Sequence, residues 1–214
     1  LQAAQECLTL LKNEKDILPL AKSSRVLVTG PTANSLSAIN GGWTNTWQGR
    51  DAQYDTKGKQ TVLEAIQEKI GAEKVTYVAG TTIEVDNNTH VDKAVNISKA
   101  AAAARRAEVA VVCLGEMSYT ENPGNLVDLT LPLPQQQLVE AIAATGTPIV
   151  LVLLEGRPRV ISKVEPQAQG ILLGYLPGNE GAPAIADVLF GDVNPSGKLP
   201  YTYPRYANDL VLYD

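Results

Sequence analysis

Apolar residues gather along this chain in two kinds of segment that alternate. Short uninterrupted runs rich in Val, Ile and Leu predict buried β-strands, and they span 25–30, 74–80, 108–114, 147–154 and 169–176. Between these runs, apolar residues recur at helical spacing, which predicts helices over 2–12, 61–71, 91–107, 134–146 and 178–192. End signals support the helices, because Gly71 closes one pattern and Pro134 opens another.

This alternation predicts the fold class. Strands that are apolar at every position are buried on both faces, as in a parallel sheet with helices on each side. The sequence therefore predicts an α/β fold, a three-layer α/β/α sandwich around a mainly parallel sheet of five to six strands. The length of 214 residues and the lack of an internal repeat favour a single domain over 1–214.

Two segments are much longer than the usual connection between a strand and a helix. The first, 31–58, follows the strand at 25–30, and the second, 115–133, follows the strand at 108–114. Most connections in compact domains have about 4–6 residues, and longer loops are often functional. Ligands of parallel sheets bind beyond the carboxyl ends of the strands, where both loops begin. The sequence therefore predicts a functional site at these two loops.

The first loop contains NGGWTNTWQGR at 40–50, with the chain's two tryptophans, Trp43 and Trp47. Their flat rings offer surfaces on which the CH faces of sugar rings stack well. The neighbouring Asn45, Gln48 and Arg50 could hydrogen-bond sugar hydroxyl groups. The alternative is that both rings only pack the loop onto the domain, and this alternative is stronger for Trp43, which follows two glycines.

The second loop, GEMSYTENPGNLVDLTLP at 115–132, contains Glu116 and Glu121. A carboxylic acid protonates a leaving oxygen best when burial against an aromatic wall raises its pKa, and Tyr119 and the tryptophans offer such a wall. Glycoside hydrolysis also needs a second carboxylate, about 5 Å away in a retaining enzyme and farther away in an inverting one. From spacing alone, two solvated loop glutamates are the favoured interpretation.

Composition and charge argue against several other functions. The net charge is −5 and Lys and Arg are scattered, so there is no basic stripe for nucleic acid. The apolar runs are far shorter than the roughly 20 residues that span a bilayer, so no membrane partner is expected. Nothing matches a phosphate-binding loop of the G-x-x-x-x-G-K-[ST] type.

The single histidine and the two cysteines narrow the chemistry further. A Ser-His-Asp triad would have to use His90, and the chain has no G-x-S-x-G motif. Clusters of His and Cys that bind zinc are also absent, so no metal and no cofactor are predicted. We expect His90 to begin the helix at 91–107 as a solvated residue, and Cys7 and Cys113 to be buried free thiols. We expect 191–200 to be a turn cluster that ends in a short strand.

Several motifs together point to a family. The chain contains, in this order and over nearly its whole length, LTLLKNEKDILPL, VLVTGP, GGWTNTWQG, GEMSYTENPGNLVDLTLP, GRP, GYLPGNEG and LFGDVNPSGKLPYTYP. In these motifs it resembles the C-terminal α/β sandwich domain of glycoside hydrolase family 3, in the β-glucosidase and exo-β-glucanase branch. The resemblance implies a retaining, exo-acting hydrolase of β-linked glucosides and oligosaccharides, whose active site lies between this domain and an N-terminal barrel.

The resemblance also implies roles for single residues. Glu121, the second glutamate of the G-E-x-x-Y-T-E motif, would be the catalytic acid/base. Trp47 would stack on the sugar in the leaving-group subsite, and Trp43 would support the loop. Glu116 and Tyr119 would line or support the same substrate pocket. The loop would be long because it reaches from the sandwich into the barrel, which would carry the nucleophilic aspartate.

The chain departs from the family pattern in two respects. It contains no barrel, and the FGYGLS-like motif that closes this domain in the family is absent, so both ends are expected to be cut from a longer polypeptide. We therefore expect the isolated chain to be inactive and its loop 115–133 to be mobile. Because many glucan-degrading family members are exported, the expected localisation is periplasmic or secreted.

Two other classes of function remain as alternatives. A stand-alone carbohydrate-binding or interaction module would use Trp43 and Trp47 and would not need the glutamates. A nucleotide-binding α/β domain would share the fold, although the chain lacks the phosphate loop that such a domain requires.

Overall fold

A six-stranded sheet forms the centre of the computed structural model, which describes residues 1–86 and 89–207. The strand order is β1-β8-β7-β6-β2-β3. All neighbours pair in parallel except β1, which is antiparallel to β8 at one edge. The predicted α/β class with a mainly parallel sheet is therefore confirmed. The strands are β1 (Thr9–Asn13), β2 (Val26–Thr29), β3 (Val75–Val78), β6 (Val109–Gly115), β7 (Ile149–Leu154) and β8 (Gly170–Tyr175).

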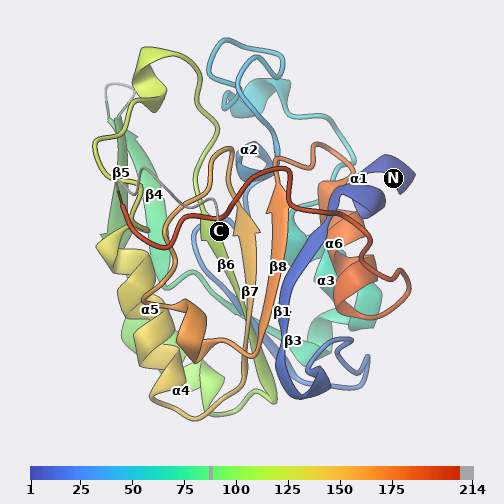
Figure 1. The fold of residues 1–214 in the computed structure, drawn as a ribbon. Coiled ribbons are helices and arrows are strands. Elements are labelled where there is room, and N and C mark those ends of the chain that lie inside the picture. The colour runs from blue at the N-terminus through green and yellow to red at the C-terminus, as the bar shows by residue number, and fades with distance from the viewer. Residues whose placement is uncertain (87–88, 208–214) are drawn as a thin grey trace.

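Helices cover both faces of this sheet (Figure 1). On one face lie α1 (Gln2–Cys7), α3 (Val62–Ile70) and α6 (Gly181–Leu189), and on the other α4 (Ile97–Ala104) and α5 (Leu133–Ala143). In β2, Val26 and Val28 belong to the first core and Leu27 to the second. Burial of each such side chain stabilises the fold by about 1.5–3 kcal/mol, which explains why the central strands β6 and β7 carry no polar side chain.

A hairpin of β4 (Thr81–Asp86) and β5 (Thr89–Ala94) stands beside the sheet and packs on α5 (Figure 1). The predicted helix over 91–107 is therefore wrong at its start, because the chain becomes helical only at Ile97. Backbone pairing with β4 takes up the first residues of that segment. The expectation for His90 is wrong as well, since His90 lies in β5, half-buried, and not at a helix start.

The predicted helix over 2–12 is also wrong in its second half. The helix ends at Cys7, Leu8 is extended, and Thr9–Asn13 form the edge strand β1. The apolar residues of LTLLKN suit either a helix or a strand, and the open edge of β8 decides in favour of the strand because it supplies hydrogen-bond partners.

Three smaller expectations can also be compared with the structure. Cys113 is a buried free thiol as predicted, but Cys7 is exposed, because the helix that carries it ends there. No strand forms at the end of the 191–200 cluster, which is irregular. The long loop 31–58 is not entirely irregular, since it contains the short helices α2 (Leu36–Ile39) and η2 (Ala52–Tyr54).

Candidate active site at the carboxyl ends of two neighbouring strands

The two long loops leave the sheet side by side, because β2 and β6 are adjacent parallel strands. Their contact centres on Gln48, whose side chain is buried. Its Nε2 donates to the Thr120 carbonyl at 3.2 Å, and its Oε1 accepts from the Thr120 amide at 3.2 Å. Ser118 Oγ donates to the Gln48 carbonyl at 2.8 Å. The Gln48 side chain is therefore committed to the second loop, and the expectation that it hydrogen-bonds sugar hydroxyls is wrong.

This contact joins the neighbours of two predicted site residues, Trp47 and Glu121. Trp47 precedes Gln48, and Glu121 follows Thr120, so each candidate is one residue away from the paired amide groups. Trp47 is 43% exposed and Trp43 is 66% exposed. Glu121 is exposed as well. In this domain, the two rings and the Glu121 side chain are therefore accessible to solvent.

Trp43 and Trp47 are held by the backbone of their own loop. The Trp43 amide donates to the Trp47 carbonyl at 3.0 Å, and Trp43 adopts φ 64°. Asn45 Nδ2 donates to the Tyr54 carbonyl at 2.9 Å, which ties the loop to η2. Arg50 contacts Gln48 Oε1 at 3.2 Å and His90 Nε2 at 3.3 Å. The polar residues of this loop thus shape the loop itself.

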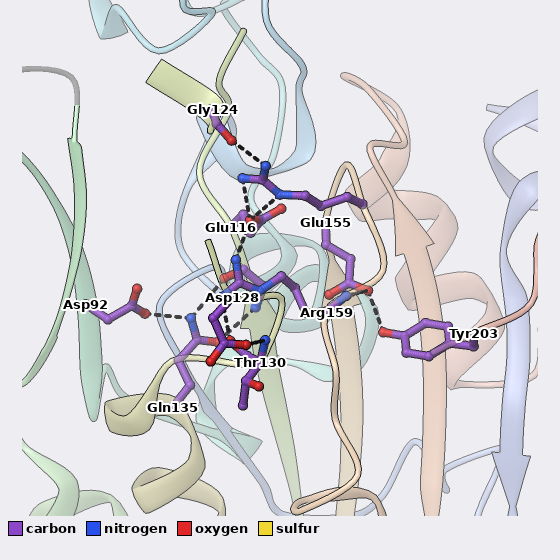
Figure 2. A network of polar contacts seen from close by, with 11 residues as sticks. Asp92, Glu116, Gly124, Asp128, Thr130, Gln135, Glu155, Arg159 and Tyr203 are labelled. Atoms are coloured by element: carbon purple, nitrogen blue, oxygen red, sulfur yellow. Dashed lines mark hydrogen bonds and ion pairs between the residues drawn. The ribbon is translucent and has the colours of Figure 1, made fainter. Parts of the chain in front are cut away.

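Glu116, the other glutamate of the second loop, is buried rather than solvated. It follows Gly115, where a Cβ would lie only 1.9 Å from the Leu154 carbonyl oxygen and where φ is +133°. Only glycine can adopt this backbone conformation so close to β7. The chain turns at Gly115 and directs Glu116 inward. Its Oε1 accepts from Arg157 Nε and from Arg159 Nη1, each at 3.0 Å. Figure 2 shows this network around Glu116.

The two arginines connect Glu116 to the rest of the loop. Arg159 Nη2 donates to the Thr130 carbonyl at 2.6 Å, and Arg157 Nη1 donates to the Gly124 carbonyl (Figure 2). The ring of Tyr119 lies under the Arg157 guanidinium, with 4.1 Å from its Cζ to the ring centroid. Burial, with the Glu116 charge as the next cause, raises the pKa of Tyr119 to about 12, so its hydroxyl stays neutral even in mildly alkaline solution.

A pocket of about 460 Å³ lies between the second loop and the β4–β5 hairpin. Glu116, Arg157 and Arg159 form part of its wall, and the hairpin contributes His90 and Asp92. Burial lowers the pKa of His90 to about 4, and the Arg50 and Arg157 charges act in the same direction. His90 is therefore neutral and accepts from Arg50. None of Trp43, Trp47 and Glu121 lines this pocket, so the candidate site is an open surface beside it.

Glu155 is a buried carboxyl that the sequence analysis did not single out. It follows β7, and its Oε1 accepts from Tyr203 Oη at 2.6 Å and from the Arg159 amide at 3.2 Å (Figure 2). Burial raises the pKa of Glu155 to about 7, against the lowering effect of these two hydrogen bonds. Its position directly after an apolar strand, like that of Glu116, is the signal that could have identified it.

Within residues 1–86 and 89–207, no group of three or more His, Cys, Asp and Glu side chains is arranged to hold a metal ion. None of the helices in these same ranges has the length and apolar character needed to cross a membrane.

The fold and these loops define an α/β sandwich domain that carries an exposed carboxylate and exposed tryptophans at the carboxyl ends of adjacent strands. The model of the glycosyl hydrolase family 3 C-terminal domain matches residues 8–214, and the chain belongs to this family.

The known relatives of this chain are longer proteins. It is 37% identical to a lysosomal beta glucosidase of Dictyostelium discoideum, over 97% of this chain and 25% of that protein. It is also 37% identical to a periplasmic beta-glucosidase of Salmonella typhimurium, over 99% of this chain and 29% of that protein. The crystal structure of a beta-glucosidase from Listeria innocua in complex with isofagomine matches with a TM-score of 0.79 and 28% identity, over 96% of this chain and 26% of that chain. The chain thus spans about a quarter of the length of these relatives.

Proposed function

We propose that this chain is the C-terminal domain of a retaining, exo-acting β-glucosidase or exo-β-glucanase. In this proposal Glu121 is the acid/base that protonates the leaving oxygen, and Trp47 stacks on the sugar of the leaving-group subsite with Trp43 beside it. The nucleophilic aspartate belongs to an N-terminal barrel, and the chain without that barrel is inactive. The substrate is a β-linked glucoside or oligosaccharide, attacked at its non-reducing end.

One observation carries the proposal: the Gln48 side chain pairs with the Thr120 backbone. It joins the tryptophan loop to the glutamate loop next to Trp47 and Glu121, which supports a shared site for these two residues. A general acid and an aromatic platform for the departing sugar need this proximity, because both act on the same leaving group. The relatives named as beta-glucosidases support the same assignment.

The other predicted site residues have supporting roles in the proposal. Glu116 is buried and bound to two arginines, so it acts on the substrate only through the loop that it anchors. Tyr119 is packed under Arg157 and serves the same loop. For localisation we propose the periplasm or secretion, and the relatives described as periplasmic and lysosomal support a site outside the cytoplasm.

The stereochemical outcome tests the reaction class. The longer polypeptide that contains this domain and its barrel is incubated with an aryl β-glucoside, from which the glycone is the only sugar released, and the anomers of the released glucose are followed by proton NMR. A retaining enzyme passes through a covalent glycosyl-enzyme, so the β-anomer is expected first and the α-anomer only later by mutarotation. Early release of the α-anomer would exclude a retaining mechanism, and absence of any release would exclude the hydrolase.

Replacement of Trp47 by Ala tests the leaving-group subsite. The variant is expected to raise KM for a glucose disaccharide by roughly 5- to 30-fold, because stacking of one sugar on an exposed aromatic ring is worth about 1–2 kcal/mol. KM for an aryl glucoside should change less. Trp43→Ala is the matched variant and should have the smaller effect. Equal effects of Trp47→Ala and Trp43→Ala on the disaccharide would contradict the assignment of the subsite to Trp47.

A further inference from the structure

The backbone at Glu121 has an unusual conformation. Its φ is 55° and its ψ is −145°, a combination that glycine tolerates and that a residue with a side chain rarely adopts. A backbone of this kind persists only where the surrounding structure holds it from both sides. The contacts on either side of Glu121 therefore decide where its carboxylate points.

On the N-terminal side, the Gln48 amide group holds the Thr120 peptide through two hydrogen bonds. On the C-terminal side, the Gly124 amide donates to the Glu121 carbonyl at 2.9 Å and closes the turn η4 (Asn122–Gly124). The Gly124 carbonyl in turn accepts from Arg157 Nη1. Arg157 thus binds the turn that fixes the C-terminal side of Glu121.

Arg157 also contacts the loop on the other side of Glu121, through Tyr119. The guanidinium lies 4.1 Å from the centre of the Tyr119 ring. The Tyr119 ring also packs against the turn at Gly124. A Cβ at Gly124 would lie only 2.2 Å from Tyr119 Cδ2, so the ring and the turn are in tight contact. One side chain therefore holds residues on both flanks of Glu121, at positions 119 and 124.

Glu116 fixes the orientation of the guanidinium. Arg157 Nε and Nη2 both lie 3.0 Å from Glu116 Oε1, and Glu116 is itself held by Arg159. The Arg157 side chain is 23% exposed, so it is largely shielded from water. Arg157 contacts the Glu116 carboxylate through two nitrogens, the Gly124 carbonyl through the third, and the Tyr119 ring through its flat face. This set of contacts requires a planar guanidinium group, which lysine lacks.

From this geometry we propose that Arg157 is a positioning residue for the acid/base, acting through Gly124 and Tyr119 on the backbone of Glu121. The inference rests on the proposed function, because it concerns the direction of the Glu121 carboxylate in that reaction. Arg157 does not act on the substrate itself. Its loss leaves the carboxyl group present but turns it away from the leaving oxygen.

The test compares two substrates in the longer polypeptide that carries the barrel. One is a β-glucoside with a sugar leaving group, which needs proton donation, and the other has an activated aryl leaving group, which needs little. For Arg157→Lys we expect kcat/KM to fall about 10- to 100-fold for the first substrate, as for a general acid displaced by about 1 Å, and less than about 3-fold for the second. The parameter kcat/KM is compared because it reports the step in which the leaving group departs.

Two further measurements separate positioning from a general loss of structure. Hydrogen exchange of the peptide that covers 115–133 should become faster in Arg157→Lys, whereas the melting temperature should fall little because the lysine retains a positive charge beside Glu116. Arg105→Lys is the matched control, since Arg105 is exposed at the end of α4, and it should change neither exchange nor selectivity.

Glu121→Gln, assayed in parallel, distinguishes failure of this inference from failure of the proposed function. If Glu121→Gln selectively loses activity on the substrate with the sugar leaving group and Arg157→Lys does not, the proposed role of Arg157 is wrong and the proposed function stands. The proposed role of Arg157 would also be overturned if Arg157→Lys lowered kcat/KM equally for both substrates, or if hydrogen exchange of 115–133 were unchanged. If Glu121→Gln hydrolyses both substrates normally, the acid/base assignment and the inference fall together.

Discussion

Replacing Glu121 with Gln in the longer polypeptide is expected to lower kcat/KM for a β-glucoside with a sugar leaving group by about 10²- to 10⁴-fold, the usual contribution of a general acid. A sugar alkoxide is a poor leaving group and needs a proton as the bond breaks. An activated phenolate departs without one, so the aryl glucoside should lose less than about tenfold at this step. The measurement is the ratio of the two kcat/KM values in variant and parent enzyme.

The control for this experiment is Glu140→Gln, because Glu140 is an exposed glutamate on α5, outside the two loops. It should leave both rates unchanged. If Glu121→Gln hydrolyses both substrates normally, the general acid lies elsewhere and the domain only shapes the site. A longer polypeptide that binds sugars through Trp43 and Trp47 but hydrolyses none would favour the alternative of a carbohydrate-binding module.

Replacing Glu116 with Gln is expected to destabilise the domain by about 3 kcal/mol, because loss of one partner leaves buried charges without compensation. Both arginines point at the same oxygen, Glu116 Oε1, and the Arg159 side chain is only 6% exposed. For a domain of this size the change corresponds to a fall of roughly 6–12 °C in melting temperature, measured by calorimetry on the longer polypeptide.

The double variant Glu116→Gln with Arg159→Met sharpens this second experiment. It removes the more deeply buried positive charge together with its partner, so part of the lost stability should return. A fall of less than about 3 °C in the single variant would show that the Glu116 network contributes little to stability. The activity ratio of the two substrates should change less in Glu116→Gln than in Glu121→Gln, because Glu116 does not face the leaving group.

The sequence predicted those parts of the fold that depend on local pattern. In β6 and β7 every residue is apolar and buried, so no alternative competes with a central parallel strand. The segments 9–12 and 91–94 were predicted as helix but form strands, because their strand character depends on partners, β8 for the first and β4 for the second. Such pairing is a tertiary effect that overrides local periodicity.

The same distinction applies to the candidate site. The two loops were located from their lengths, and Trp47 and Glu121 from their motifs. The part played by Gln48 was not predictable, because its amide group could bind a sugar or a backbone, and only the fold places it on Thr120. Arg157 appeared in the sequence only as part of a GRP motif, and its role depends on three partners that are distant in the sequence.

The antiparallel edge strand β1 has a consequence for the synthesis of the protein on the ribosome. Thr9 pairs with Leu173, so β1 is made long before its partner exists. At about 5–20 residues per second, the nascent chain carries this segment unpaired for roughly ten seconds or more. When β8 emerges and joins β7, its free edge would be open to strands of neighbouring nascent chains. Because β1 has already been synthesised, it can pair with that edge as soon as β8 forms, and the short strand β1 then becomes the outer edge of the sheet.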